Sequence, residues 1–197
     1  MPFSQAILQS PAVVPSGKQP SSTYQDFLAV LNVTSLQEAR NLSSGAIIAA
    51  NAQYIGSQPL NAYGFFPVQD GTFMPDIPYR AIQDHAFDTS VRVLTAHNSL
   101  EGSFFFDPTV KTEDDFKRWI VISLPGLSVN AASYLADHLY PPVFDGSLGY
   151  VDQDSRQMKL WGEAAIDCTF QLFNEAFGGD SHACKFPKSA GGSSVSK

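Results

Sequence analysis

A single glutamate stands where a buried strand gives way to a polar loop, in the stretch RVLTAHNSLEGSFFF at residues 92–106. The apolar run at 92–96 predicts a strand, and the loop that follows it is mostly polar. Parallel α/β sheets carry their chemistry at the carboxyl ends of their strands, and Gly102 allows close backbone approach beside the acid. Glu101 is therefore a candidate catalytic carboxylate, although the pattern fits a solvated loop acid equally well.

Glu101 has few chemical partners in this sequence. Nowhere among the 197 residues is there a G-x-S-x-G, the turn that exposes a nucleophilic serine in α/β-hydrolases, and DGSLG at 145–149 has the wrong spacing. There is likewise no Gly-rich oxyanion loop, no phosphate-binding Gly-Lys-Ser/Thr, no H-E-x-x-H and no cysteine paired with a suitable histidine. The residues alone thus indicate no metal site, no cofactor site and no complete nucleophile.

The histidines are scattered along the chain: His85, His97, His138 and His182. His97 lies four residues before Glu101 and could contact it, but a loop histidine that hydrogen-bonds to backbone is the favoured interpretation. We expect His138, on a helix, and His182, near the start of a strand, to be structural.

Two further groups of residues beside the acid have plain structural interpretations. We expect the phenylalanines at 104–106 to pack in a core or against a helix rather than to line a substrate site. We expect Glu113, Asp114 and Asp115 to form a solvated first helical turn that the helix dipole stabilises.

The composition excludes several classes of partner. The 197 residues are 44% hydrophobic and 16% charged, which is enough for a core, and the net charge is −7. An acidic chain lacks the basic face that non-specific binding to nucleic acid or anionic membranes needs. No apolar run approaches the roughly 20 residues of a membrane span, and residues 1–20 have neither the n-region nor the h-region of a signal peptide.

The localisation stays unknown on the residues alone. Asn32 and Asn41 begin N-glycosylation sequons, which point to secretion, but such three-residue matches are common by chance. Cys168 and Cys184 are too few for a disulfide scaffold and lack metal-ligand spacing, so we expect two small buried side chains.

Before the acid, the chain predicts one strand and long loops around several helices. The apolar stretch 3–9 predicts a buried strand, and a Pro/Ser/Gly-rich loop follows over 11–22. Residues 56–80 are mostly loop, with a turn at Asp70-Gly71. Helical spacing and capping residues predict the helices, which are 24–31, a helix capped by Ser35 with Glu38, and 44–54 after Ser43.

After the acid, caps and breakers again predict the helices. They are 113–124 capped by Thr112 with Asp115, 129–140 between Ser128 and Pro141-Pro142, and 154–177 ended by Gly178-Gly179. Residues 182–186 predict one more strand. The domain then covers 1–187, and the low-complexity residues 188–197 are expected to be a disordered tail.

These elements predict an α/β fold with two or three parallel strands, many helices and long loops. So few strands cannot bury both faces of a parallel sheet against so many helices. We therefore expect part of a larger domain.

Several stretches resemble the type-B carboxylesterases, the cholinesterase-like group of the α/β-hydrolases, in the style of fungal members. FSQAILQSPA is similar to the strand after that family's nucleophile helix, and FFPVQDGTFMPDIP to its Pro-x-x-Asp-Gly-x-x-x-Pro stretch. RVLTAHNSLEGSFFF is similar to its strand-then-acid segment, and WGEAAIDCTFQLFNEAFGG to the long helix before its histidine strand. LNVTSLQEARNLSSGAIIAAN fits the helices between, so that the resemblance covers about residues 3–186.

The resemblance implies a role for Glu101. In this family the glutamate of a Glu-Gly pair holds a histidine in the right tautomer and stabilises its charged form, while the histidine activates a serine. The family's serine motif lies upstream of Met1, and its histidine segment would follow HACKFPK. His182 does not match the catalytic position, and Leu100 stands where an Asp is usual. The cholinesterase partner of Cys168 also falls outside the sequence.

The resemblance predicts a truncated C-terminal-half fragment of a type-B carboxylesterase with a partial α/β-hydrolase fold. It would be a carboxylic ester hydrolase that retains the triad acid Glu101, lacks the serine and the histidine, and is inactive as an isolated chain. An ester substrate is expected only for a restored full-length domain, and self-association is expected through an exposed sheet edge. No cofactor, metal, nucleic acid or membrane span is expected, and the family is commonly secreted. The alternative is a non-catalytic cholinesterase-like protein-binding module, although adhesion relatives with this fold retain the complete sheet.

Overall fold

The computed structural model describes residues 3–12, 21–60, 62, 64–67, 69–178 and 181–187. The strands in these ranges are β1 Gln5–Gln9, β2 Arg92–Asn98 and β3 Ser181–Phe186. The α-helices are α1 Ser21–Val30, α2 Leu36–Arg40, α3 Ser44–Gly56, α4 Pro78–Gln83, α5 Glu113–Ser123, α6 Val129–Tyr134, α7 Gln153–Gly162 and α8 Cys168–Phe177. A 3-10 helix, η1 Glu101–Phe104, and two π-helical segments, η2 Leu135–Leu139 and η3 Glu163–Asp167, complete the set.

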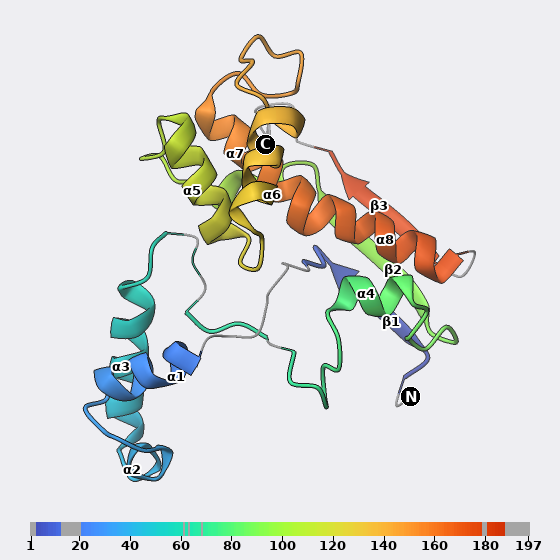
Figure 1. The fold of residues 1–197 in the computed structure, drawn as a ribbon. Helices are drawn as coiled ribbons and strands as arrows, with labels where there is room; N and C mark the ends of the chain where they lie inside the picture. The colour runs from blue at the N-terminus through green and yellow to red at the C-terminus, as the bar shows by residue number, and fades with distance from the viewer. Residues whose placement is uncertain are drawn as a thin grey trace, which may run out of the picture.

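The three strands form one parallel sheet in the order β1-β2-β3 (Figure 1). Gln5 pairs with Arg92, and Leu94 pairs with His182. The predicted parallel pairing of 3–9 with 92–96 is confirmed, and so are the third strand and the α/β class. The prediction that the first strand is buried was wrong, because the residues of β1 alternate between exposed and half-buried. The crossover between β1 and β2 contains α1 to α4, as a parallel connection requires.

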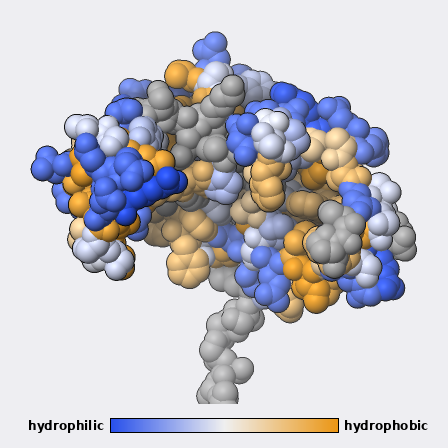
Figure 2. Space-filling view, turned by 90° about the horizontal axis from the view of Figure 1, so that it is seen from below, coloured by the Kyte–Doolittle hydropathy of each residue, from blue (hydrophilic) through white to orange (hydrophobic). Residues whose placement is uncertain are grey.

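The two faces of the sheet have different environments. Val93, Thr95 and His97 alternate along β2 and are buried on the face that α8 covers (Figure 1). Thr95 fixes this contact, because its Oγ1 donates to Oδ1 of Asn174 over 3.0 Å. On the opposite face Ile7 is 69% exposed and Phe186 is 56% exposed. In the view from below, hydrophobic residues reach the surface between hydrophilic ones (Figure 2).

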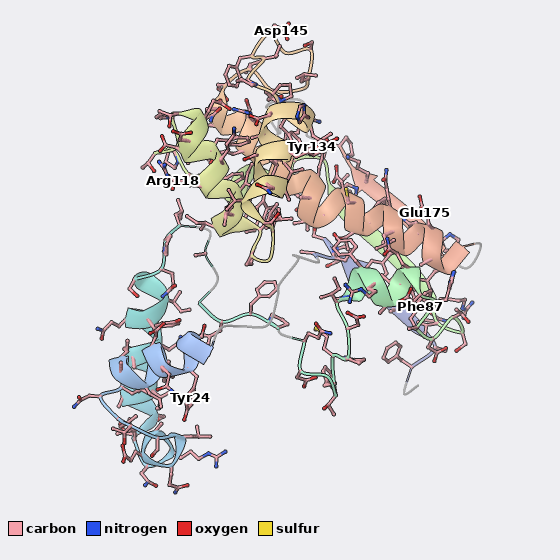
Figure 3. All side chains as sticks on the ribbon, viewed as in Figure 1. Tyr24, Phe87, Arg118, Tyr134, Asp145 and Glu175 are labelled. Carbon is pink, nitrogen blue, oxygen red and sulfur yellow. The ribbon has the colours of Figure 1, made fainter. Side chains whose placement is uncertain are left out.

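The largest core lies between the helices that follow the acid, and not under the sheet. It contains Phe116 and Trp119 of α5 together with Leu160 and Trp161 of α7, all at most 2% exposed. Arg118 and Tyr134 lie on the outer surface of this helical group (Figure 3).

Arg156 lies inside this core with no exposed surface, and its charge is fully paired. Its guanidinium donates two hydrogen bonds to Glu113, at 2.7 and 3.0 Å, and one each to the carbonyls of Tyr140 and Ala136. It also stacks 3.9 Å over the ring of Phe116. Glu113 lies in the first turn of α5 with its side chain 43% exposed, as predicted, but its carboxylate also neutralises this buried cation.

The helices α1, α2 and α3 lie together at one side of the molecule (Figure 1). Phe27 of α1 and Tyr54 of α3 make an edge contact at 5.9 Å between ring centroids. The sequon residues Asn32 and Asn41 are exposed in the turns before and after α2.

The predicted caps are found, with one change of partner. Thr112 and Asp115 form a reciprocal capping box on α5, and Ser43 and Ser128 cap α3 and α6. Ser35 accepts from the backbone N–H of Glu38, but Glu38 reaches back to Thr34 rather than to Ser35. The Glu38 carboxylate thus satisfies a donor one residue earlier than the motif predicts.

The single long helix predicted over 154–177 is divided. It runs as α7, the π-helical segment η3 and α8, and it ends at Gly178 with φ 57°, as predicted for a glycine cap. Cys168, at the start of α8, and Cys184, on β3, are both free and exposed, so the prediction of two buried side chains was wrong. The tail predicted over 188–197 lies outside the described residues.

Candidate functional site

Glu101 lies directly beyond the carboxyl end of β2, where the chain turns into the 3-10 helix η1. Its Oε1 accepts hydrogen bonds from the backbone N–H of Asn98 at 2.5 Å, from the Asn98 side-chain amide at 3.1 Å and from the Ser10 hydroxyl at 2.7 Å. The hydrogen bonds between described residues and this carboxylate all reach Oε1. One oxygen is therefore fixed by neutral donors, while the geometry leaves Oε2 to accept from another group.

Ser10 brings the neighbouring strand into the site. It follows β1 with φ 51°, and its backbone N–H donates to the carbonyl of Ala96 at 2.6 Å. This extra bond beyond the end of β1 turns the Ser10 hydroxyl toward Glu101. The sequence pattern predicts Ser10 only as the end of a strand, and nothing local to position 10 signals a partner 91 residues away.

Gly102 allows the acid loop to lie directly against α7. A Cβ built on Gly102 would lie 1.8 Å from the carbonyl oxygen of Met158. One turn later, a Cβ on Gly162 would lie 3.1 Å from the Gly102 nitrogen. A glycine therefore follows Glu101 because Gly102, in η1, lies so close to α7 that no room is left for a side chain, and Gly162, at the end of α7, faces it.

The strand places His97 in the core and not in the polar loop. The strand continues to Asn98, two residues past its predicted end, and His97 is 3% exposed. Its Nδ1 lies 2.9 Å from the carbonyl oxygen of Asn98, which confirms the predicted backbone contact, and 3.1 Å from Oδ1 of Asp167. No hydrogen bond joins Glu101 to any of the four histidines, all of which are among the described residues.

The phenylalanines that follow the acid have different environments. Phe105 stacks on Trp161 with ring centroids 3.5 Å apart and an angle of 8° between the planes. Phe104 is 88% exposed. Core packing is therefore confirmed for Phe105 and wrong for Phe104, which extends into solvent one turn after Glu101.

A polar cavity of about 220 Å³ lies beside the acid loop. Glu101 and Gly102 form one side, and α7, η3 and the end of β3 provide Lys159, Glu163 and Lys185. Lys159 donates to Glu163 at 2.5 Å, so the charges in the wall are largely paired. Glu163 also accepts from Tyr140, and burial together with this carboxylate raises the pKa of the Tyr140 phenol far above its usual value.

The described residues include no group of three or more His, Cys, Asp and Glu side chains placed to hold a metal ion. Within the same ranges, no helix is long and apolar enough to cross a membrane.

Comparisons with known proteins found similar sequences and similar folds. No protein-family model matches the chain. Carboxylesterase patB of Penicillium expansum is 35% identical over 188 residues, which are 94% of this chain and 34% of that protein. Carboxylesterase patB of Aspergillus clavatus is 38% identical over 178 residues, which are 89% of this chain and 32% of that protein. The chain thus spans about a third of the length of the curated relatives it matches.

Solved esterases share the fold. A PNB esterase superposes with a TM-score of 0.69 at 19% identity, over 94% of this chain and 38% of the esterase. The carboxylesterase EST55 of Geobacillus stearothermophilus superposes with a TM-score of 0.66 at 14% identity, over 96% of this chain and 39% of EST55. The three parallel strands and their helices therefore correspond to part of an α/β-hydrolase fold.

Proposed function

Since this chain is a relative of the type-B carboxylesterases, we propose that it supplies the acid, Glu101, of a Ser-His-Glu triad in a carboxylic ester hydrolase. The observation that carries the proposal is the geometry of the carboxylate at the end of β2. Three donors fix Oε1, and this leaves Oε2 for the N–H of a histidine. A solvated loop acid would not need a serine from a second strand to orient it.

The proposed chemistry follows from that orientation. Oε2 of Glu101 accepts from Nδ1–H of the histidine, which fixes the tautomer whose Nε2 can take a proton from the serine hydroxyl. As the serine attacks the ester carbonyl, the histidine becomes charged, and the carboxylate stabilises that charge. The neutral donors on Oε1 hold the carboxylate in place without neutralising it.

We further propose that the serine and the histidine come from residues outside these 197. The sequence holds no G-x-S-x-G, and none of its histidines bonds to Glu101. The curated relatives are about three times as long as the matched segment, which supports this division. The 197-residue chain alone would then hydrolyse no ester, because an acid without a histidine has nothing to orient.

A chimera tests the proposal. The whole 197-residue chain replaces the matching segment of the Penicillium expansum carboxylesterase, and hydrolysis of short-chain nitrophenyl esters is measured. Glu101→Gln should lower kcat by about 10⁴-fold, as loss of a triad acid does elsewhere. His138→Leu, an exposed position on η2, is the matched control and should leave kcat unchanged.

Two results would contradict the proposal. The first is a chimera in which Glu101→Gln retains full kcat. The second is ester hydrolysis by the 197-residue chain alone that exceeds a heat-denatured control and disappears on Glu101→Gln.

A further inference from the structure

We infer that His97 is a positioning residue for Glu101 and that Asp167, at the end of the π-helical segment η3, holds it in place. This inference rests on the proposed function of Glu101. It names two residues that contact neither the carboxylate nor a substrate. Their effect passes through Asn98, which bonds to His97 on one side and to Glu101 on the other.

The contacts of His97 define its tautomer. Nδ1 lies 2.9 Å from the Asn98 carbonyl and 3.1 Å from Oδ1 of Asp167, and both of these oxygens are acceptors. Nδ1 must therefore carry the proton, which it donates to the Asn98 carbonyl with the Asp167 carboxylate close beside it. The ring also contacts Phe170, at 4.3 Å between centroids, so the imidazole is held at its edge and on its face.

The N–H of His97 fixes Asn98, the residue that binds the acid. The carbonyl of Asn98 accepts from His97, while the backbone N–H and the side-chain amide of Asn98 donate to Oε1 of Glu101 at 2.5 and 3.1 Å. Hydrogen bonds thus fix Asn98 at its carbonyl oxygen, at its backbone N–H and at its side-chain amide. If His97 lost its N–H, the Asn98 carbonyl would lose this donor, and the orientation of Asn98 toward Glu101 would be less well defined.

Asp167 connects this arrangement to the helix and to the third strand. Its Oδ2 lies 3.4 Å from Nζ of Lys185, which pairs with His97 across the sheet. Asp167 lies where the π-helical turn shifts the helix relative to a regular α-helix, and such turns occur often at functional sites. One carboxylate therefore joins the start of α8 to the carboxyl ends of β2 and β3.

The experiment uses the same chimera and compares three variants. His97→Leu removes the N–H and keeps an apolar side chain, His97→Asn restores an N–H donor near the Nδ1 position, and His138→Leu is the exposed control. His97→Leu should lower kcat about 10- to 100-fold with KM little changed, as expected for a misplaced catalytic group. His97→Asn should recover most of kcat, and His138→Leu should match the parent.

Hydrogen exchange of the backbone N–H of Asn98 gives a second measurement, which can also be made on the 197-residue chain. This N–H should exchange faster in His97→Leu and at the parental rate in His97→Asn. If the chimera has no activity, this exchange comparison decides the inference.

The outcomes separate this inference from the proposed function. If Glu101→Gln retains activity, the proposed function is wrong. The inference is then wrong as well, because His97 would position a residue that has no catalytic role. If Glu101→Gln abolishes activity but His97→Leu keeps kcat and Asn98 protection at the parental level, only the inference is overturned. A failure of His97→Asn to recover kcat would also overturn it. The N–H donor of His97 would then not be what positions Glu101.

Discussion

The hydroxyl of Ser10 donates to Oε1 of Glu101 over 2.7 Å, which links the ends of two neighbouring parallel strands at the acid. Both residues follow their strands directly, Ser10 after β1 and Glu101 within three residues of β2. The parallel arrangement therefore brings a donor from one strand to a carboxylate from the next.

The first prediction compares two substitutions of Ser10, which distinguish the role of its hydroxyl group from the role of its backbone conformation. Ser10 has φ 51°, where glycine is less strained than alanine. In the chimera, Ser10→Ala and Ser10→Gly should both lower kcat by about 10- to 150-fold, since a hydrogen bond to a charged group contributes about 1.5–3 kcal/mol. Ser10→Gly should retain a higher urea midpoint than Ser10→Ala. Equal midpoints with unequal kcat values would contradict this account.

The second prediction concerns the contact between Gly102 and Met158. Gly102→Ala would place a methyl group 1.8 Å from the Met158 carbonyl oxygen, so η1 and α7 would have to separate. Unfolding free energy of the chimera should fall by about 3 kcal/mol, the upper range for overpacking, and kcat should fall with it. Gly56→Ala is the control, since a Cβ there meets nothing within 4 Å, and it should be neutral or slightly stabilising. A Gly102→Ala variant as stable as the control would show that the loop lies elsewhere.

Much of the fold could be predicted from local pattern, and the site only in part. The strand, the polar loop and the Glu-Gly pair all fall within 15 residues, so the sequence alone indicates Glu101 as the candidate acid. Ser10 lies 91 residues away from it in sequence, and Asp167 lies in the distant segment η3. Neither carries a local signal, because only the pairing of the strands and the packing of α8 bring them near.

The differences between prediction and structure have physical causes of the same kind. Glu113 has the sequence context of a solvated helix start, and only the fold places the buried Arg156 beside it. Phe104 and Phe105 are indistinguishable by type, yet the 3-10 turn directs Phe105 onto Trp161 and Phe104 into solvent. Helical periodicity also does not reveal the π-helical turn, because one widened turn barely changes the spacing of apolar residues.

The third prediction concerns the buried pair of Arg156 and Glu113. Arg156→Met should destabilise the chimera by about 3–5 kcal/mol, because two buried backbone carbonyls lose their donor and each such loss costs about 1–3 kcal/mol. Glu113→Gln removes the counter-charge of the buried guanidinium but should cost less, because a glutamine oxygen can still accept from Arg156, which also keeps two carbonyl acceptors and an aromatic face. Urea unfolding of both variants checks the order, and the reverse order would contradict it.

The fourth prediction is a pH dependence at Cys168. Although Cys168 is exposed as a residue, partial burial of its thiol, with the carboxylates of Glu163 and Asp167 close by, raises the pKa of Cys168 above its usual value. Less thiolate is then present at pH 8 in the folded chain than in the unfolded chain, and the thiolate is the nucleophile. Alkylation of Cys168 by iodoacetamide, followed by peptide mass spectrometry, should be slower than in urea, and Glu163→Gln should speed it. Equal rates with and without urea would show that the thiol is not perturbed.

The last prediction is that the 197-residue chain self-associates. β1 has a paired neighbour on one side within the described sheet, so its other edge presents backbone donors and acceptors, and Gln5–Gln9 holds no charge or proline to discourage pairing. Beside that edge the uncovered face exposes Ile7 at 69%, and each uncovered apolar side chain forgoes about 1.5–3 kcal/mol of burial. Light scattering of the purified chain should therefore show oligomers.

Ile7→Lys should shift the distribution toward monomer, because a charge on the edge strand opposes pairing. Val129→Lys, at a residue of α6 with 70% exposure, should leave the distribution unchanged. A stable monomer with one sharp cooperative unfolding transition would show instead that these three strands and their helices fold as an independent domain.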